Sequence, residues 1–260
     1  MSTLNITVED GVCVVELNRP HAMNSIDPEM RAELRDFYPR MKTDEDIRVV
    51  IFTGAGDKAF CTGADLKKTM PDPNESYAQT LLGKGDPGGS FIGIETDKPL
   101  ICAVNGWALG GGTELVTMCD ITIASENAKF GLTEVRRGSI PWAGAIQHLP
   151  RSLSKSDAMM MLLTGDVFTA QEALRMGLVS KVVPHDQLMS TAMDLGRRIA
   201  RNAPLAVRAV KQLWTRGQDM PLTHALQIDK YMYGLLKDTE DRVEGRKAFA
   251  EKREPVWKGR

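Results

Sequence analysis

Three consecutive glycines, Gly110 to Gly112, impose the strongest constraint on how this chain can fold. They follow an apolar run, Leu100–Val104, that has the composition of a buried strand. Because glycine has no Cβ, backbone at this point can approach a ligand or another segment closely. We therefore expect a strand to pass into a helix here, with accessible N–H groups at the junction.

Two glutamates accompany this junction. Glu114 stands three residues past the middle glycine, about one helical turn on, and Glu134 follows twenty residues later. Preorganised N–H groups stabilise a developing oxyanion, and a nearby carboxyl group can move a proton. The segment therefore predicts proton transfer beside an oxyanion site.

The apolar pattern predicts strands mixed with helices, followed by an all-helical end. Strands are expected at residues 6–8, 12–17, 49–53, 100–104, 120–124 and 179–183. Asp27-Pro28-Glu29 is typical of a helix start, and Thr169 with Glu172 forms a capping box for a helix that Gly177 ends. Only helical periodicity follows Asp186. We expect an α/β core over residues 1–200 and a helical region over 201–260.

Composition excludes several classes of protein. The chain has 260 residues, enough for one substantial core, and its net charge of −1 does not favour nucleic acid or an acidic membrane. It has no secretory pattern and no run of ~18 apolar residues. The four cysteines lack metal-ligand spacing and are expected to be buried, reduced thiols. We therefore expect a soluble cytoplasmic protein, with a mobile functional loop at residues 70–89.

Several familiar catalytic motifs are absent. The sequence has no GxxxxGK[ST] phosphate loop, no GxSxG nucleophile turn and no HExxH pair. Its four histidines are scattered, so a metal site has no support. Gly54-Ala55-Gly56 matches only part of a dinucleotide-binding loop, which argues against an oxidoreductase.

Six segments stand out along nearly the whole chain: LNRP…MNS (17–25), AFCTGADL (59–66), AVNGWALGGGTEL (103–115), FGLTEVRRGSIP (130–141), LTGDVFTAQEALRMGLVSKVV (163–183) and EGRKAFAEKREPVWKG (244–259). In this order they resemble the motifs of the enoyl-CoA hydratase/isomerase (crotonase) superfamily. The resemblance implies an α/β crotonase-type fold, in which repeated ββα units form a superhelical core with a helical C-terminal extension.

The resemblance also implies the reacting groups. The N–H groups of Ala64 and Gly111 match an oxyanion hole that binds the thioester carbonyl of an acyl-CoA. Glu114 and Glu134 match the two glutamates of hydratases, which hold one water molecule. We expect Glu114 to activate the water and Glu134 to supply the proton to C2, although both roles can be shared through that water. Their closeness should separate their pKa values, so that one stays protonated near neutral pH.

The implied contacts to coenzyme A come from three places. Segments 22–25 and 65–67 match backbone and side-chain contacts to CoA, and a C-terminal aromatic–lysine pair matches one that closes over CoA, often from a neighbouring subunit. The candidate binding residues are Ala22, Ser25, Asp65, Leu66, Lys67, Phe249 and Lys252. CoA is here part of the substrate, no metal or redox cofactor is implied, and a homotrimer or a dimer of trimers is expected.

Two departures from the family pattern concern the acyl group. Trp142 stands in Ile140–Ala145 where hydratases usually carry glycine, and its indole is expected to narrow or reshape the acyl pocket. The 70–89 segment, which usually helps to line the acyl tunnel, is proline-rich and slightly long. Both changes favour a short or unusual acyl group.

We predict addition of water across the 2,3 double bond of a 2-enoyl-CoA. The alternatives on the same scaffold are an isomerase, dehydratase, hydrolase or decarboxylase. A non-catalytic binding protein would be expected to lack one glutamate, and both are present. A basic run between Arg197 and Arg216 is where RNA binding would begin, but its helical spacing favours a solvated face.

Overall fold

The computed structural model describes residues 2–69, 91 and 93–260, so the loop expected at 70–89 lies outside the described residues. The strands are β1 (Leu4–Glu9), β2 (Val12–Leu17), β3 (Val49–Gly54), β4 (Ala59–Cys61), β5 (Leu100–Val104), β6 (Trp107–Leu109), β7 (Ile121–Ser125), β8 (Lys129–Gly131), β9 (Val167–Thr169) and β10 (Lys181–Val183). The α-helices are α1 (Pro28–Thr43), α3 (Gly111–Met118), α4 (Ala145–Ser152), α5 (Lys155–Thr164), α6 (Ala170–Met176), α7 (Leu188–Ala200), α8 (Pro204–Gly217), α9 (Leu222–Lys237) and α10 (Glu240–Glu251). Short 3₁₀ helices are η1 (Pro20–Ala22), η2 (Glu134–Arg137) and η3 (His185–Gln187).

A six-stranded sheet in the order β1-β2-β3-β5-β7-β10 forms the frame of the molecule. Its strands from β2 onward are parallel, and only β1 pairs antiparallel to its neighbour. Val49 and Ile51 of β3 face a cluster shared with α7, whereas Val50 and Phe52 face the main core. Burial on both faces explains why β3 and β5 are continuous apolar runs.

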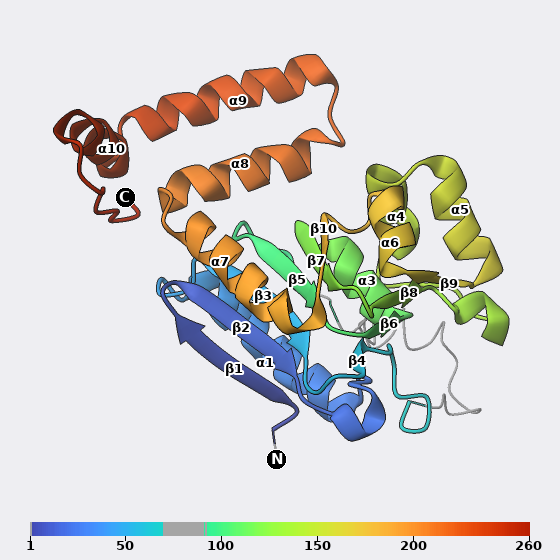
Figure 1. Ribbon diagram of the computed structural model, residues 1–260. Coiled ribbons are helices and arrows are strands. Elements are labelled where there is room, and N and C mark those ends of the chain that lie inside the picture. Colours follow the sequence, from blue (N-terminus) through green and yellow to red (C-terminus); the bar gives the residue numbers. More distant parts are fainter. Residues whose placement is uncertain (1, 70–90, 92) are drawn as a thin grey trace, which may run out of the picture.

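A second, four-stranded sheet in the order β4-β6-β8-β9 lies beside the first. β3, β5 and β7 are neighbours in the large sheet, and β4, β6 and β8, which follow them in the chain, are neighbours in the small one. The β5-β6-α3 segment is therefore one unit of the expected ββα superhelix (Figure 1). This confirms the predicted α/β class and crotonase-type core.

The predicted positions of the long elements are confirmed, with small shifts at their ends. Asp27 caps α1 by accepting a hydrogen bond from the N–H of Met30, and the capping box of Thr169 and Glu172 is present at α6. Gly177 ends α6 with φ +91°. The strand expected at 120–124 is β7, which starts one residue later, and the strand expected at 179–183 shortens to β10.

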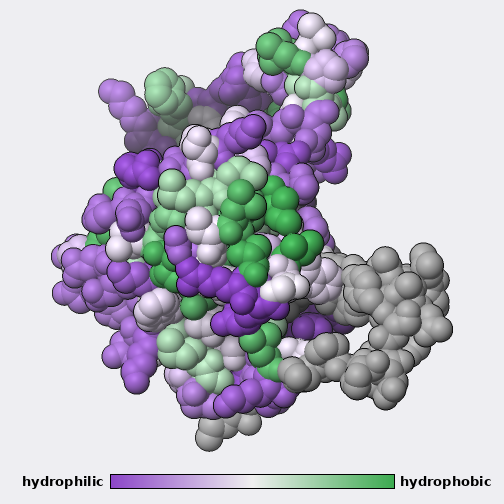
Figure 2. All heavy atoms as spheres, turned by 90° about the vertical axis from the view of Figure 1, so that its right-hand side faces the viewer, coloured by the Kyte–Doolittle hydropathy of each residue, from purple (hydrophilic) through white to green (hydrophobic). Residues whose placement is uncertain are grey.

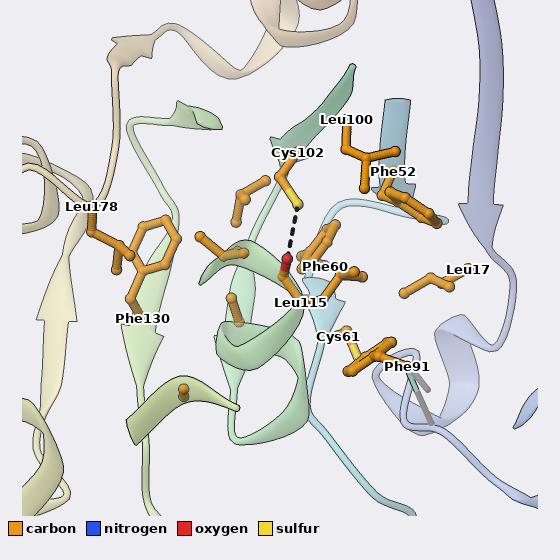
Figure 3. Packing of buried hydrophobic residues seen from close by; sticks show 14 of the residues in the cluster. Leu17, Phe52, Phe60, Cys61, Phe91, Leu100, Cys102, Leu115, Phe130 and Leu178 are labelled. Carbon is orange, nitrogen blue, oxygen red and sulfur yellow. Dashed lines mark hydrogen bonds between the residues drawn. The ribbon is translucent and has the colours of Figure 1, made fainter. Parts of the chain in front are cut away.

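Helix α3 is anchored in the main hydrophobic cluster (Figure 3). Leu115 of α3 packs among buried residues that include Phe60, Leu100 and Phe130. The thiol of Cys102 lies 4.0 Å from the carbonyl oxygen of Leu115. The four cysteines are free thiols; those at positions 13, 61 and 102 are buried as expected, whereas Cys119 is only half-buried.

The C-terminal helices lie outside the two sheets, with α9 and α10 farthest from them (Figure 1). Lys211 of α8 pairs with Asp120 at 2.8 Å, and Arg208 pairs with Asp97 at 2.8 Å, so α8 is attached to the core. Three cations of the basic run, Arg197 among them, are thus engaged in ion pairs. In the described ranges, every helix is too short or too polar to span a bilayer.

Candidate active site

The two glycine turns singled out in the sequence meet in space. A Cβ atom built on Gly63 would stand 2.9 Å from the N of Gly111, and one built on Gly111 would stand 3.3 Å from the Cα of Gly63. Gly63 has a φ of +80°, which side chains rarely tolerate. The backbone of the turn at Ala64 therefore lies directly beside the N-terminus of α3.

The N–H groups of Ala64 and Gly111 remain available for a ligand. Within the described residues, neither of them donates a hydrogen bond to another group of the protein. Gly111 is the first residue of α3, where N–H groups have no partner in the helix and the helix dipole is positive. Two such donors side by side can bind one anionic oxygen.

Glu114 lies in the first turn of α3 and is only 3 % exposed. Its Oε1 accepts hydrogen bonds from the N–H groups of Ala143 at 2.8 Å and Ala145 at 3.4 Å. Burial, and then the charge of Glu134, raise the pKa of Glu114 to about 7, while the two N–H donors act in the opposite direction. Near neutral pH this carboxyl can therefore either give or take a proton.

Glu134 begins η2, three residues after the end of β8. A Cβ atom built on Gly110 would stand 2.8 Å from its Oε1, so glycine at position 110 makes room for this carboxyl group. Its Oε2 is buried and has no hydrogen-bond partner among the described residues. Burial raises the pKa of Glu134, against the lowering effects of its own backbone N–H and of Arg137. The fold thus brings the two predicted carboxyl groups together.

The two segments expected to contact CoA also lie side by side. The N–H of Ile26 donates to the carbonyl of Gly63 at 2.8 Å, and the N–H of Asp65 donates to the carbonyl of Ile26 at 2.9 Å. Ser25 is buried next to this bridge, and Ala22 ends η1 just before it. Leu66, at 54 % exposure, and Lys67 are open to solvent beside Ala64. These residues therefore lie next to the turn at Ala64.

The remaining candidate residues, Trp142 and the pair Phe249 and Lys252, lie in two different parts of the molecule. Trp142 is 51 % exposed and precedes Ala143, one of the donors to Glu114. Phe249 is 88 % exposed on α10, and Lys252 caps that helix with φ +55°. Because α10 lies at the far end of the molecule from α3 and β4 (Figure 1), a single chain does not bring Phe249 and Lys252 to the glutamates.

Sequence reasoning did not assign a role to the donors that hold Glu114, nor to Arg19. Gly144, between the two donors, has a φ of +112°, and this glycine is the signal that marks a tight turn. Arg19 is buried and binds Ser25 and Asp65, which were both predicted contacts to CoA. Its appearance in the first family-like motif was the only sequence signal for it.

Comparisons with known proteins agree with this geometry. The family model described as enoyl-CoA hydratase/isomerase matches residues 7–260. An (E)-benzylidenesuccinyl-CoA hydratase of Thauera aromatica is 48 % identical, with 98 % of this chain and 99 % of that protein covered. A 2,3-dehydroadipyl-CoA hydratase of Escherichia coli K12 is 40 % identical over the whole of both chains. The crystal structure of an enoyl-CoA hydratase from Bacillus anthracis superposes with a TM-score of 0.90 at 37 % identity and covers 99 % of this chain and 100 % of that one.

These relatives are hydratases of CoA thioesters, and they match the chain from end to end. In this chain the two glycine turns lie side by side, and the buried Glu114 and the half-buried Glu134 lie close to each other. The chain therefore belongs to the enoyl-CoA hydratase/isomerase (crotonase) family.

Proposed function

We propose that this protein is an enoyl-CoA hydratase, which adds water across the 2,3 double bond of a 2-enoyl-CoA to give the 3-hydroxyacyl-CoA. The observation that carries the proposal is the pair of adjacent carboxyl groups: Glu114 is buried, and the half-buried Glu134 has an oxygen, Oε2, without a partner in the described part of the chain. An isomerase, a hydrolase or a decarboxylase does not need to hold a water molecule between two carboxyl groups.

In this mechanism the thioester carbonyl accepts hydrogen bonds from the N–H groups of Ala64 and Gly111. Addition of the water oxygen at C3 moves the π electrons onto the thioester oxygen as an enolate, which these two donors stabilise. One such donor typically contributes about 3–4 kcal/mol to lowering the barrier. The proposal needs no cofactor beyond the CoA of the substrate.

Glu114 and Glu134 supply and remove the protons. Glu114 takes a proton from the water as its oxygen bonds to C3, and Glu134 gives a proton to C2 as the enolate collapses. The two N–H bonds to Oε1 of Glu114 orient this carboxylate and support its ionised form. Burial raises the pKa of both carboxyl groups, so that the pair can hold the proton that is given to C2. Transfer of the proton from Glu114 to Glu134 then returns the pair to its starting state.

Trp142 and the CoA-contact residues define the substrate side of the proposal. The half-exposed indole of Trp142 is proposed to contact the acyl group, since Trp142 precedes a residue that binds Glu114, and it favours a short or unusual chain. Ala22, Ser25, Asp65, Leu66 and Lys67 surround the Ala64 turn and are proposed to bind CoA. The similarity to an (E)-benzylidenesuccinyl-CoA hydratase makes that thioester the first one to test.

The reaction is tested by following the absorbance of the conjugated thioester. Crotonyl-CoA, 2,3-dehydroadipyl-CoA and (E)-benzylidenesuccinyl-CoA are each incubated with the enzyme, and Glu114→Gln is the matched control. We expect the absorbance of at least one thioester to fall, with a 3-hydroxyacyl-CoA found by mass spectrometry. If all three retain their conjugated absorbance, the hydratase assignment fails.

The same proposal includes a cytoplasmic homotrimer or dimer of trimers, formed by residues 201–260. Exposed apolar side chains on the last three helices support it: Val210, Trp214, Leu222, Leu226, Ile228, Tyr231, Tyr233, Leu235, Val243 and Phe249. A second apolar cluster faces the viewer in Figure 2. Helix α5 has the exposed apolar side chains Met159, Met160 and Leu163. Two such surfaces permit head-to-tail contacts that close into a ring.

The assembly would allow Phe249 and Lys252 of one subunit to reach the CoA of another. Its mass is measured by light scattering, with Leu226→Lys and Leu235→Lys combined in one variant. We expect a trimer or hexamer for the original chain and a smaller species for the variant. A monomeric mass for the original chain would contradict this part of the proposal.

A further inference from the structure

The N–H of Ala64 is presented by a short two-stranded bridge. Ile26 pairs in parallel with Ala64, using its own N–H and carbonyl to bind Gly63 and Asp65. Because neighbouring residues in extended backbone direct their N–H groups to opposite sides, the N–H of Ala64 points away from Ile26. The direction of this donor therefore depends on how rigidly the bridge is held.

The side chain of Arg19 fastens both strands of that bridge. Its Nη1 donates to the carbonyl of Ser25, the residue before Ile26, and lies 3.3 Å from the hydroxyl oxygen of Ser25. Its Nη2 lies 3.3 Å from Oδ2 of Asp27, the residue after Ile26. The same Nη2 donates to Oδ2 of Asp65, the residue after Ala64, at 2.9 Å. One guanidinium thus spans three of the residues that flank the paired positions.

This contact set requires an arginine. The Arg19 side chain is 6 % exposed, and those of Asp27 and Asp65 are 1 % and 13 % exposed. Lys68 completes a neutral group of four charges by donating to Asp27 at 2.6 Å. The hydrogen bond from Arg19 is the main reason that the pKa of Asp65 is lowered. A guanidinium is a planar fork with five donors, whereas an ammonium is a point charge that cannot reach all three partners.

We infer that Arg19 is a positioning residue for the oxyanion hole, because it locks the Ile26–Ala64 bridge and so aims the N–H of Ala64 at the thioester oxygen. The inference rests on the proposed function, which makes Ala64 one of the two donors. Among the described residues, the Arg19 side chain makes its hydrogen bonds and ion pairs with Ser25, Asp27 and Asp65 and not with Glu114 or Glu134. Its loss should therefore weaken polarisation of the carbonyl more than it weakens binding of CoA.

The test compares Arg19→Lys with Arg197→Lys, a matched control. Arg197 also forms two ion pairs, with Glu9 and Asp10, but it lies on α7. The probe is butyryl-CoA labelled with ¹³C at the carbonyl, a saturated thioester that cannot be hydrated. Infrared difference spectra record its carbonyl frequency when free and when bound. The rate of crotonyl-CoA hydration is measured in parallel.

We expect the original protein to lower the carbonyl frequency of the bound thioester, since hydrogen bonds weaken the C=O bond. Arg19→Lys should lose about half of this shift or more, and kcat should fall about tenfold while KM changes less than about threefold. Arg197→Lys should match the original protein in all three measurements. Asp65→Asn, which keeps the shape of a partner of Arg19 but removes its charge, should show a smaller loss in the same direction.

The possible outcomes distinguish failure of the role inferred for Arg19 from failure of the proposed function. If Arg19→Lys is folded and shows the original frequency shift, the positioning role is wrong. If the original protein produces no shift, the oxyanion hole itself fails, whatever Arg19 does. If Arg19→Lys does not fold, Asp65→Asn decides: an unchanged shift and kcat in that variant overturn the inference.

Discussion

Helices α3 and α9 are both rich in apolar residues, yet their surroundings are opposite. Residues 112–116 of α3 are buried, and a Cβ atom built on Gly112 would stand 1.9 Å from the carbonyl oxygen of Cys61. None of the sixteen residues of α9 is buried, and Leu222 and Leu235 are 72 % and 68 % exposed. The chain therefore buries α3 with its own contacts, whereas its C-terminal helices have exposed apolar faces.

The largest expected effect tests the chemistry at α3. Glu114→Gln and Glu134→Gln should each lower kcat by about 10²- to 10⁴-fold, because each removes a group that transfers a proton. Binding of acyl-CoA, measured by calorimetry, should change little, since the oxyanion donors remain. Phe249→Ala on α10 is the comparison in the C-terminal region, and it should mainly raise KM. A glutamate variant with near-original turnover would remove that residue from the mechanism.

The second prediction concerns the stability cost of the buried carboxyl. Burial raises the pKa of Glu114 to about 7 in the folded protein, from the ordinary glutamate value of 4.5 that applies when the chain is unfolded. Between these values the folded state binds more protons, so the free energy of unfolding falls as pH rises. Glu114→Gln removes this loss and should be more stable than the original protein at pH 8, by at most about 3 kcal/mol.

Urea unfolding at pH 5 and pH 8 measures this difference. The gain should shrink at pH 5, where Glu114 is protonated and neutral in the fold. Glu244 in the C-terminal region is the contrasting case, since hydrogen bonds from Arg253 lower its pKa to about 2. Its ion pair is present above the unfolded pKa and is lost only as pH falls towards 2. Equal stability changes at both pH values would contradict the role given to burial of Glu114.

The smallest expected effects come from a pair of glycine substitutions, one in each region. Gly112→Ala forces a methyl group against the carbonyl of Cys61 and should destabilise the protein by about 1–3 kcal/mol. Gly234→Ala lies in α9, where a Cβ atom would meet nothing within 4 Å, and should stabilise it by about 1 kcal/mol. Thermal unfolding of both variants checks the signs. Destabilisation by Gly234→Ala would show that another subunit packs closely there.

Long elements with strong local signals were predictable because the apolar pattern of a short stretch of sequence indicates which of its residues are buried. Residues 12–17 and 100–104 are β2 and β5 as predicted, and Asp27 and Thr169 cap the helices expected after them. The strands of the small sheet were not predicted. β4, β6, β8 and β9 have three residues each, too few to show alternation, and they exist because neighbouring strands pair with them.

The transition from strand to helix at the three glycines was also predicted only in part. The expected step from the 100–104 strand to a helix is interrupted by β6, and the helix begins only at Gly111. The glycines are needed because the backbone of α3 packs against the turn at Gly63 and against Cys61. That requirement comes from another segment of the chain, so sequence spacing marks the position of the contact without revealing its partner.

Residue types and their order therefore specified the family-like motifs, the two glutamates and the helical C-terminal region. Folding decided which of these groups meet: it placed Gly63 against Gly111, Glu114 under the N–H groups of Ala143 and Ala145, and Arg19 across the Ile26–Ala64 bridge. The reason is physical. Local signals report backbone preference and burial, whereas a pKa near 7 or an aimed N–H depends on desolvation and on partners that are distant in the chain.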